Sequence, residues 1–197
     1  MNLPTSIRSL LKFQNGTITS RDIATIGISR TMLSNYVRAG LLEKASRGVY
    51  VTPSSIPDEL FSISKRTHHI VFSHETAAFL LGISERTPFN HTVTIRSSQT
   101  ISSALRVGLT CFYIKDDTYT LGLSQATTQF GNTVPCYDLE RTVCDMIRDR
   151  PRIDDETFLT TIRNYSRSSK HDIVRLSFYA EKMNLAKKVA SIMEFVL

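Results

Sequence analysis

The chain lacks the long apolar runs that a membrane protein needs. No stretch of its 197 residues approaches the roughly 20 consecutive apolar residues that span a bilayer. Residues 1–11 also do not form a signal peptide, because polar side chains and Pro4 stand where a continuous apolar stretch would be required. These absences predict a cytoplasmic protein with no membrane partner.

Cysteine is scarce and its spacing is uninformative for metal binding. Cys111, Cys136 and Cys144 are odd in number and contain no CxxC pair. This pattern argues against a disulfide framework and against a zinc ribbon, and it suits a reducing compartment. His74 and Glu75 begin a segment that lacks the second histidine of the HExxH metal motif. We therefore expect no metal ion and no cofactor.

Signatures of catalysis are missing as well. The sequence has no Gly-rich phosphate loop, no GxSxG nucleophile elbow and no kinase signature. Asp116 and Asp117 follow Lys115, but no Glu-x-Lys stands on the next expected strand, as a nuclease would require. We expect the protein not to be an enzyme. A nuclease-like second domain stays open as an alternative, which a metal-dependent activity abolished by Asp116→Ala or Asp117→Ala would support.

What the chain does have is a globular composition with positive charge near its N-terminus. Apolar residues make up 41% and charged residues 21%, which predicts an ordered core. The net charge is +6, and residues 1–50 hold seven basic side chains against two acidic ones. The rest of the chain is nearly balanced. Positive charge concentrated in one small module is what binding to a polyanion requires.

Punctuation and periodicity divide the chain into two parts. Residues 53–57, with two prolines and two serines, are typical of a short linker. We therefore expect an N-terminal domain over residues 1–52 and a larger domain over 58–197. Four segments of the larger domain alternate as strands do, and four later ones have helical spacing. The expected strands are 91–95, 109–114, 118–123 and 133–137, and the expected helices are 139–149, 155–165, 171–183 and 185–196. An earlier helix, opened by Ser73 as N-cap, should run to Leu81. The predicted fold class is mixed α/β.

The N-terminal domain has the pattern of a winged helix-turn-helix. A first helix buries Ile7, Leu10 and Leu11 and ends at residues 14–16, and a second helix over 21–26 is capped by Thr19 and Ser20. Gly27 allows a sharp turn, and Ser29 caps a third helix that ends at Gly40.

The third helix has two distinct faces. Its apolar positions are expected to pack inward: Met32, Leu33, Tyr36 and Val37. Its outward positions contain no acid and consist of side chains that donate hydrogen bonds to bases and phosphates: Arg30, Thr31, Ser34, Asn35 and Arg38. Arginine pairs bidentately with guanine, and asparagine does so with adenine. This face is predicted to recognise DNA.

A basic hairpin follows the third helix directly. Residues 41–45 and 48–51 are expected to form two strands around Ser46 and Arg47. Such a wing places Lys44 and Arg47 against the neighbouring groove or phosphate backbone. Arg21, at a helix N-terminus, is predicted to meet phosphate. A winged helix that contacts protein rather than DNA stays open as an alternative, which negligible salt dependence of nucleic-acid binding would favour.

Three segments together resemble a known family. They are the stretch from Gly40 to Tyr50, the patch Phe72–Ser84 that begins FSHETAAF, and the patch Asp138–Arg148 with sequence DLERTVCDMIR. With them, the chain resembles the AbiEi antitoxins of type IV toxin–antitoxin and abortive-infection systems over nearly its whole length. The winged segment by itself is shared by many regulators, so the two later patches are the more specific part of the resemblance.

The resemblance implies two activities. The N-terminal domain would repress its own operon by binding inverted repeats in promoter double-stranded DNA, and the C-terminal domain would counter AbiEii, a nucleotidyltransferase-like toxin, without a stable complex. For this second activity Arg141 and Arg148 are our guesses for a C-terminal antitoxin surface. Inverted repeats require two copies on DNA, yet the chain has no heptad seam. Monomer and preformed dimer both stay open.

Overall fold

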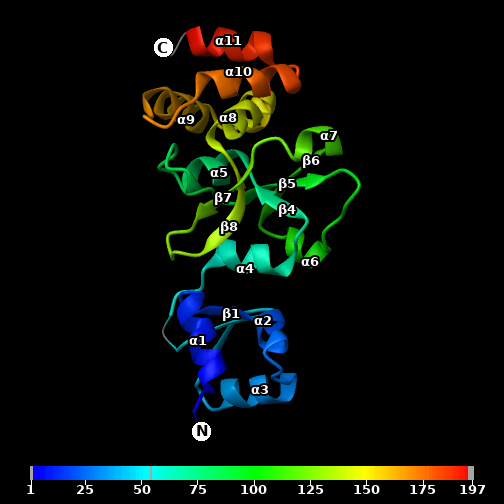
Figure 1. Cartoon of the computed structure of the whole chain (residues 1–197), viewed down its shortest axis with the longest axis vertical. Coiled ribbons are helices and arrows are strands. Elements are labelled where there is room, and N and C mark those ends of the chain that lie inside the picture. Colours follow the sequence, from blue (N-terminus) through cyan, green and yellow to red (C-terminus); the bar gives the residue numbers. More distant parts are fainter. Residues whose placement is uncertain (1, 54, 195–197) are drawn as a thin grey trace. The chain divides into compact units, whose positions relative to one another are not determined.

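The computed structural model describes residues 2–53 and 55–194 and divides into two compact units (Figure 1). Unit 1 comprises Met1–Arg66 together with Thr127–Thr133, and unit 2 comprises Thr67–Ala126 together with Val134–Leu197. The mixed α/β class expected from the sequence is confirmed by the helices and two sheets. Ser54 of the expected linker and residues 195–196 of the last expected helix lie outside the described residues.

Unit 1 has the element order of a winged helix followed by one further helix. A three-stranded antiparallel sheet has the order β1-β3-β2. The elements of unit 1 are α1 (Thr5–Phe13), β1 (Thr17–Thr19), α2 (Ser20–Thr25), α3 (Arg30–Arg38), β2 (Glu43–Ser46), β3 (Val49–Val51) and α4 (Glu59–Arg66). The helices agree with the sequence predictions. Strand β1 was not predicted, because three residues are too short to show an alternation.

Local hydrogen bonds explain where the helices of unit 1 begin. Thr19 and Asp22 form a capping box, in which each side chain bonds to the other residue's backbone N–H. The Ser29 hydroxyl accepts from the Met32 N–H and so starts α3. In the wing, Ser46 pairs with Val49, which leaves Arg47 and Gly48 in the turn. Gly48 has φ of 77°, a conformation that glycine adopts without strain.

The hydrophobic core of unit 1 lies among α1, α2, α3 and the sheet. One cluster of buried side chains joins them: Ile7, Leu11, Ile18, Ile23, Leu33, Tyr36 and Leu42. These residues come from every element between α1 and the start of β2. The core therefore fixes α3 and the base of the wing in one rigid body.

The turn between β7 and β8 belongs to unit 1, far along the sequence from the rest of it. Its anchor is the buried carboxylate of Asp58, which accepts from the Thr128 hydroxyl (2.5 Å) and the Asn132 amide (2.9 Å). Asp58 also caps α4 by accepting from the Phe61 N–H. In the sequence analysis α4 and this turn fell in the larger domain. The expected boundary at residues 53–57 differs in this respect from the division into compact units and stays a prediction.

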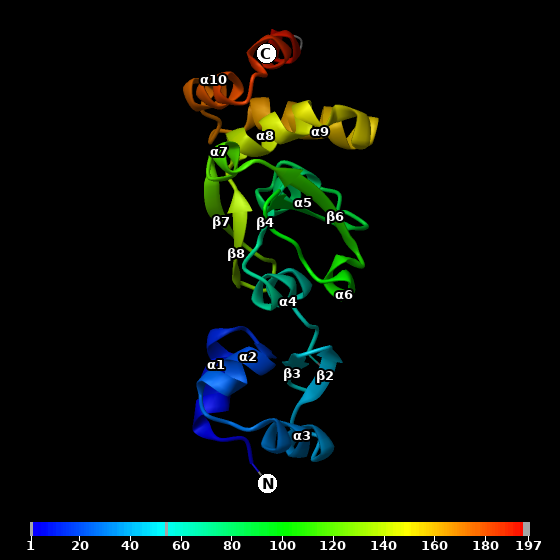
Figure 2. The ribbon, with the colours of Figure 1, turned by 90° about the vertical axis from the view of Figure 1, so that its right-hand side faces the viewer.

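Unit 2 has a five-stranded sheet of order β6-β5-β4-β8-β7 (Figure 2). Strand β4 pairs antiparallel with β5 and parallel with β8, and β5 pairs parallel with β6. The strands are β4 (Ile70–Phe72), β5 (His91–Arg96), β6 (Leu109–Ile114), β7 (Leu123–Thr127) and β8 (Thr133–Tyr137). The helices are α5 (His74–Leu80), α6 (Ser103–Arg106), α7 (Asp116–Tyr119), α8 (Leu139–Arg148), the 3-10 helix η1 (Arg150–Arg152), α9 (Asp155–Arg167), α10 (Ile173–Lys182) and α11 (Ala186–Glu194).

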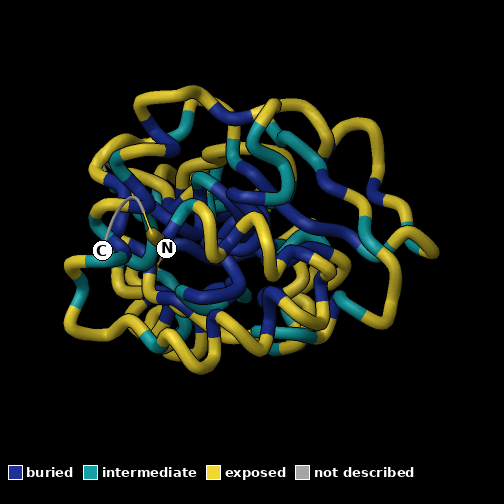
Figure 3. Tube along the Cα trace, turned by 90° about the horizontal axis from the view of Figure 1, so that it is seen from above, coloured by how far each residue is buried: buried dark blue, intermediate teal, exposed yellow. Residues whose placement is uncertain are grey.

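One hydrophobic core cluster of unit 2 lies among its helices. Helix α8 is buried along almost its whole length and packs with α5, α9, α10 and α11 around residues such as Ala78, Cys144, Ile162 and Leu176. Figure 3 shows buried stretches of the trace in dark blue and exposed turns in yellow. In the described part of the chain, no helix combines the length and apolar character needed to cross a membrane.

Two local predictions in unit 2 were wrong. The strand was expected over 118–123, but residues 118–122 are the end of α7 and a turn, and β7 begins only at Leu123. Asp117 accepts from the Thr118 N–H, and Gly122 adopts φ of 74° in the turn. A Cβ on Gly122 would lie 2.5 Å from the Cβ of Arg141, so this close approach excludes any side chain. Ser73 precedes α5 but makes no side-chain cap, since its hydroxyl bonds elsewhere.

We predict that Asp58→Ala destabilises the protein by about 2–5 kcal/mol, because it uncaps α4 and leaves two buried partners without their acceptor. Urea unfolding measures the change. Gln129→Ala is the control, because Gln129 lies in the same turn but is exposed. Equal unfolding free energies for the two variants would contradict the anchoring role of Asp58.

Candidate nucleic-acid interface

Helix α3 presents its polar face to solvent. Arg30, Thr31, Ser34 and Arg38 are exposed and Asn35 is half-buried. The opposite face is held by Leu33 and Tyr36, both buried, with Val37 packed at the edge of the core. The face that the sequence predicted to be free is therefore free of the unit 1 core, and its side chains have no acidic neighbour on their own helix.

Met32 is the exception to the predicted pattern. We expected it to pack inward, but 40% of it is exposed. On a helix of 3.6 residues per turn, Met32 lies on the flank of the stripe formed by Leu33 and Tyr36 rather than within it. The core cluster of unit 1 does not contain it. The apolar pattern i, i+1, i+4, i+5 shows the direction of the apolar stripe but not how far the core extends across it. It therefore could not show that Met32, at one flank of the stripe, is exposed.

The wing has an anchored strand and an open strand. Val49 and Val51 of β3 are buried, whereas all four residues of β2 are exposed, Lys44 among them. Arg47, in the turn, is exposed as well. The chain passes from α3 into the wing within a few residues, with the Leu41 N–H bonded to the Tyr36 carbonyl and Leu42 in the shared core. Helix face and basic hairpin thus come from one rigid body.

The two acidic residues of the N-terminal segment, Asp22 and Glu43, differ in how far they are buried. Asp22 is buried, caps α2 and forms an ion pair with Lys65 at 3.2 Å. Burial alone would raise the pKa of Asp22, but hydrogen bonds from Thr19 and the charge of Lys65 outweigh it and hold the pKa below its usual value. Its negative charge is thereby balanced inside unit 1. Arg21, one residue earlier, is exposed, and Glu43 is exposed on the wing.

Arg141 is not a surface residue, which corrects its assignment to an antitoxin surface. Its side chain is 0% exposed. The guanidinium donates to Asp145 at 3.0 Å, to the carbonyls of Thr118 and Leu121, and lies over the ring of Tyr137. A basic residue on an amphipathic helix is usually solvated. Only the tertiary structure shows that α7 and the turn after it cover Arg141. Arginine is here a structural clamp.

Arg148 is partly accessible but engaged. Its side chain is 25% exposed, and it pairs with Asp145 at 3.0 Å and with Asp149 at 2.9 Å. The carboxylate of Asp145 therefore lies between two guanidiniums. A role for Arg148 in antitoxin activity stays a prediction.

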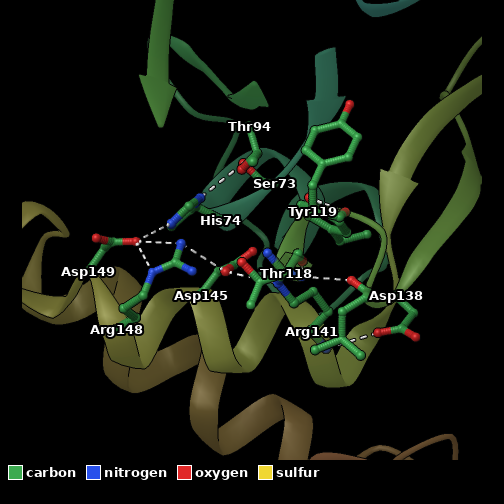
Figure 4. Close-up of polar contacts among 12 residues, drawn as sticks. Ser73, His74, Thr94, Thr118, Tyr119, Asp138, Arg141, Asp145, Arg148 and Asp149 are labelled. Atoms are coloured by element: carbon green, nitrogen blue, oxygen red, sulfur yellow. Dashed lines mark hydrogen bonds and ion pairs between the residues drawn. The ribbon is translucent and has the colours of Figure 1, made fainter. Parts of the chain in front are cut away.

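His74 connects this ion-pair chain to the sheet (Figure 4). It is fully buried, stacks on Phe112 with ring centroids 3.6 Å apart, and its Nε2 lies 3.0 Å from Asp149. Its Nδ1 lies 2.9 Å from the Ser73 hydroxyl, which itself accepts from Thr94. Because Ser73 accepts from Thr94, its own proton is available to Nδ1, which favours the tautomer with its proton on Nε2, facing the carboxylate.

The two sequence patches that carry the more specific part of the resemblance thus meet in one buried network. Ser73 and His74 come from the first patch, and Arg141, Asp145 and Arg148 from the second. Their side chains bond to one another and to backbone carbonyls. This arrangement assigns them to holding α5 against α8, and it explains why a motif of charged residues occurs in a core.

The other polar groups in the described part of unit 2 do not form a recognisable binding site. Asp116 pairs with Arg96 at 3.1 Å, on the surface. Within residues 2–53 and 55–194, no three His, Cys, Asp or Glu side chains lie together so that they could hold a metal. A cavity of about 340 Å³ lies between α5, the loop before β5 and the start of α9. Its charged lining is balanced, with Glu75 and Asp154 facing Arg86 and Arg152, so it favours no ligand of one sign.

We predict that Asp149→Asn lowers the free energy of unfolding by about 2 kcal/mol at neutral pH. Burial would raise the pKa of Asp149, but the hydrogen bond from His74 and the charge of Arg148 lower it overall. A depressed folded-state pKa gives stability that is present above the unfolded value, about 3.9, and is lost as pH falls through the folded value. The difference between wild type and variant should therefore shrink below about pH 4.

Urea unfolding at neutral and acidic pH measures this difference. Asp155→Asn is the matched control, because Asp155 is an acid of the same region whose side chain is 84% exposed. An Asp149→Asn effect that is no larger than the control, or that is the same at both pH values, would count against the network.

With the geometry established, three comparisons place the chain among known proteins. Residues 6–53 match the model of a protein family described as "Transcriptional regulator, AbiEi antitoxin". No curated protein matches the chain. Among solved structures, the crystal structure of the RV2827C protein from Mycobacterium tuberculosis aligns at 13% identity with a TM-score of 0.56. The alignment covers 95% of this chain and 78% of that chain, and at such an identity it shows the fold alone.

The matched segment begins within α1 and ends just after β3, so it contains the helix-turn-helix and the wing but no part of unit 2. The resemblance expected from the sequence is thereby confirmed for this segment: residues 6–53 match the model of the AbiEi antitoxin family of transcriptional regulators.

Proposed function

We propose that unit 1 binds promoter DNA and represses the operon of a toxin–antitoxin system. The observation that carries this proposal is the exposed, acid-free face of α3, which is held from behind by buried Leu33 and Tyr36. The match of residues 6–53 to a family of transcriptional regulators supports it. A rigid donor surface favours DNA binding, because side chains on a mobile helix would lose entropy when they bind, and this loss would weaken affinity.

Each residue of the interface has a role set by its chemistry. Arg30, Asn35 and Arg38 enter the major groove and read base edges, because guanidinium and amide groups make bidentate hydrogen bonds there. Thr31 and Ser34 add base or phosphate contacts from the same face. A helix-turn-helix places the N-terminal end of its recognition helix nearest the bases, which makes Arg30 the principal candidate.

The wing and α2 supply contacts to the backbone. Arg47 in the exposed turn and Lys44 on the open strand β2 lie against phosphates or the neighbouring groove. Arg21 meets a phosphate from the first turn of α2. These cations position the protein without reading sequence, so their loss weakens binding to every duplex alike.

Inverted repeats in the promoter would engage two copies of unit 1. Half-sites one helical turn apart, or a multiple of it, bring two identical recognition helices into successive major grooves. Two monomers that assemble on the site satisfy this geometry as well as a preformed dimer does.

Unit 2 is proposed to supply the antitoxin activity, against a nucleotidyltransferase-like toxin of the AbiEii type and without a stable complex. This activity has to depend on its exposed residues, because Arg141 and His74 are inside the core. The exposed basic residues of α9 to α11 are the available surface: Arg163, Arg167, Lys170, Arg175, Lys182, Lys187 and Lys188.

We predict that Arg30→Ala or Asn35→Ala each cost about 1–3 kcal/mol of binding free energy to the cognate duplex and relax its sequence preference. Arg47→Ala should instead weaken binding to all sequences and lower the slope of log affinity against log salt by roughly one. Gel-shift titration at several salt concentrations separates the two effects, with DNA from upstream of the coding sequence as the probe.

The matched control is Arg163→Ala, which removes an exposed arginine from α9 in unit 2 and changes the net charge equally. If the triple variant Arg30→Ala, Asn35→Ala, Arg47→Ala bound with wild-type affinity, the interface would be wrongly assigned. Binding that is insensitive to salt would favour a protein-interaction role for the winged helix.

We also predict that repression and antitoxin activity are separable in the full-length chain. The triple variant should lose repression of a promoter reporter by at least about tenfold and still rescue growth of cells that express the toxin. The full chain is used because the turn 127–133 belongs to unit 1, and a fragment starting after the linker would lack Asn15, which donates to Asn132 of that turn. Loss of rescue in a stably folded triple variant would contradict separability.

A further inference from the structure

Met32 is an exposed apolar side chain at one edge of the polar recognition face. It is the third residue of α3, and 40% of it is exposed although the adjacent Leu33 is buried. Its backbone N–H bonds to the Ser29 hydroxyl, so its position in the first turn is fixed by the cap. The exposed thioether lies in the turn that a helix-turn-helix brings closest to the bases.

Helix geometry pairs Met32 with Asn35. Residues three apart on a helix are surface neighbours, with Cβ atoms about 5–6 Å apart. Both therefore lie on the same edge of the exposed face, while Arg30 occupies the other edge, next to Val37. The edge formed by Met32 and Asn35 combines one apolar side chain with one amide that is half-buried and so restricted in orientation.

One base pair presents the complement of this combination in the major groove. Adenine offers N7 and N6–H to a bidentate asparagine, and its partner thymine carries the C5 methyl group, the apolar feature of the major-groove edge. A G·C pair offers no such methyl. A flexible, unbranched thioether adapts well to a methyl group whose position varies with local DNA shape.

We propose that Met32 determines specificity by contacting a thymine methyl, in the same base pair whose adenine Asn35 reads or in the next one. The inference rests on the proposed DNA-binding function and adds to it that each half-site contains an A·T pair under the first turns of α3. The Met32 side chain, whose exposure to water is unfavourable in the free protein, is buried when the protein binds the cognate site.

Deoxyuridine isolates the methyl group, because it keeps every hydrogen-bonding group of thymine. A cognate duplex is first selected from random-sequence DNA with the wild-type chain, and each thymine is then replaced singly by deoxyuridine. Wild type should lose affinity about fourfold at one thymine per half-site, the value for one buried methyl-sized group. Met32→Ala should bind the two duplexes equally at that position.

Two further variants make the readout specific. Met32→Leu should retain a preference for thymine over deoxyuridine, because it restores an apolar side chain. Phe13→Ala, which removes an exposed apolar side chain from α1 in the same unit, should leave the wild-type preference unchanged. Thermal unfolding of all variants checks that they are folded.

The outcomes separate this inference from the proposed function. A wild-type chain that selects no DNA overturns both. A wild-type chain that binds a specific duplex but shows no thymine preference at any position, or a Met32→Ala variant that keeps the full preference, overturns the role of Met32 and leaves DNA binding intact.

Discussion

The organisation of unit 1 depends on one packing contact, the burial of Leu33 and Tyr36 in its core. These side chains fix the rotation of α3 about its axis, and that rotation decides which residues can reach a ligand. The same cluster contains Leu42, so the wing starts from a defined point relative to the helix. A polar face would be a set of independently moving side chains without this anchor, and the entropy of ordering them would oppose binding.

Unit 2 shows how charged residues can specify a core. Isolated buried charges are expensive. They are tolerated in α8 because Arg141 and Arg148 converge on the carboxylate of Asp145, and the Nη1 of Arg141 donates to two backbone carbonyls. Gly122 has no room for a Cβ where the chain approaches Arg141. The network ties together segments far apart in sequence, and this constraint explains why the two charged patches lie inside rather than on an active surface.

Unit 1 is discontinuous in sequence, and a single carboxylate accounts for much of that organisation. Asp58 caps α4 and also accepts from Thr128 and Asn132, about seventy residues later. Each of its bonds supplies an acceptor to a buried donor. The consequence is that the regulatory segment matched by the AbiEi family is folded together with residues that lie outside the match.

The sequence by itself determined the helices of unit 1, their caps and the polar face of α3, because these depend on periodicity and on hydrogen bonds between near neighbours such as Thr19 and Asp22. The tertiary structure alone decided whether a residue at the edge of an apolar or polar stripe is buried or exposed. Met32 and Arg141 both occupy positions on amphipathic helices, yet one is exposed and the other is fully buried. Periodicity gives the direction of a face but not the extent of the layer packed on it, since that layer comes from distant segments such as α7 and the turn after it. For the same reason, a division of the chain based on linker residues could not assign the turn 127–133 to unit 1.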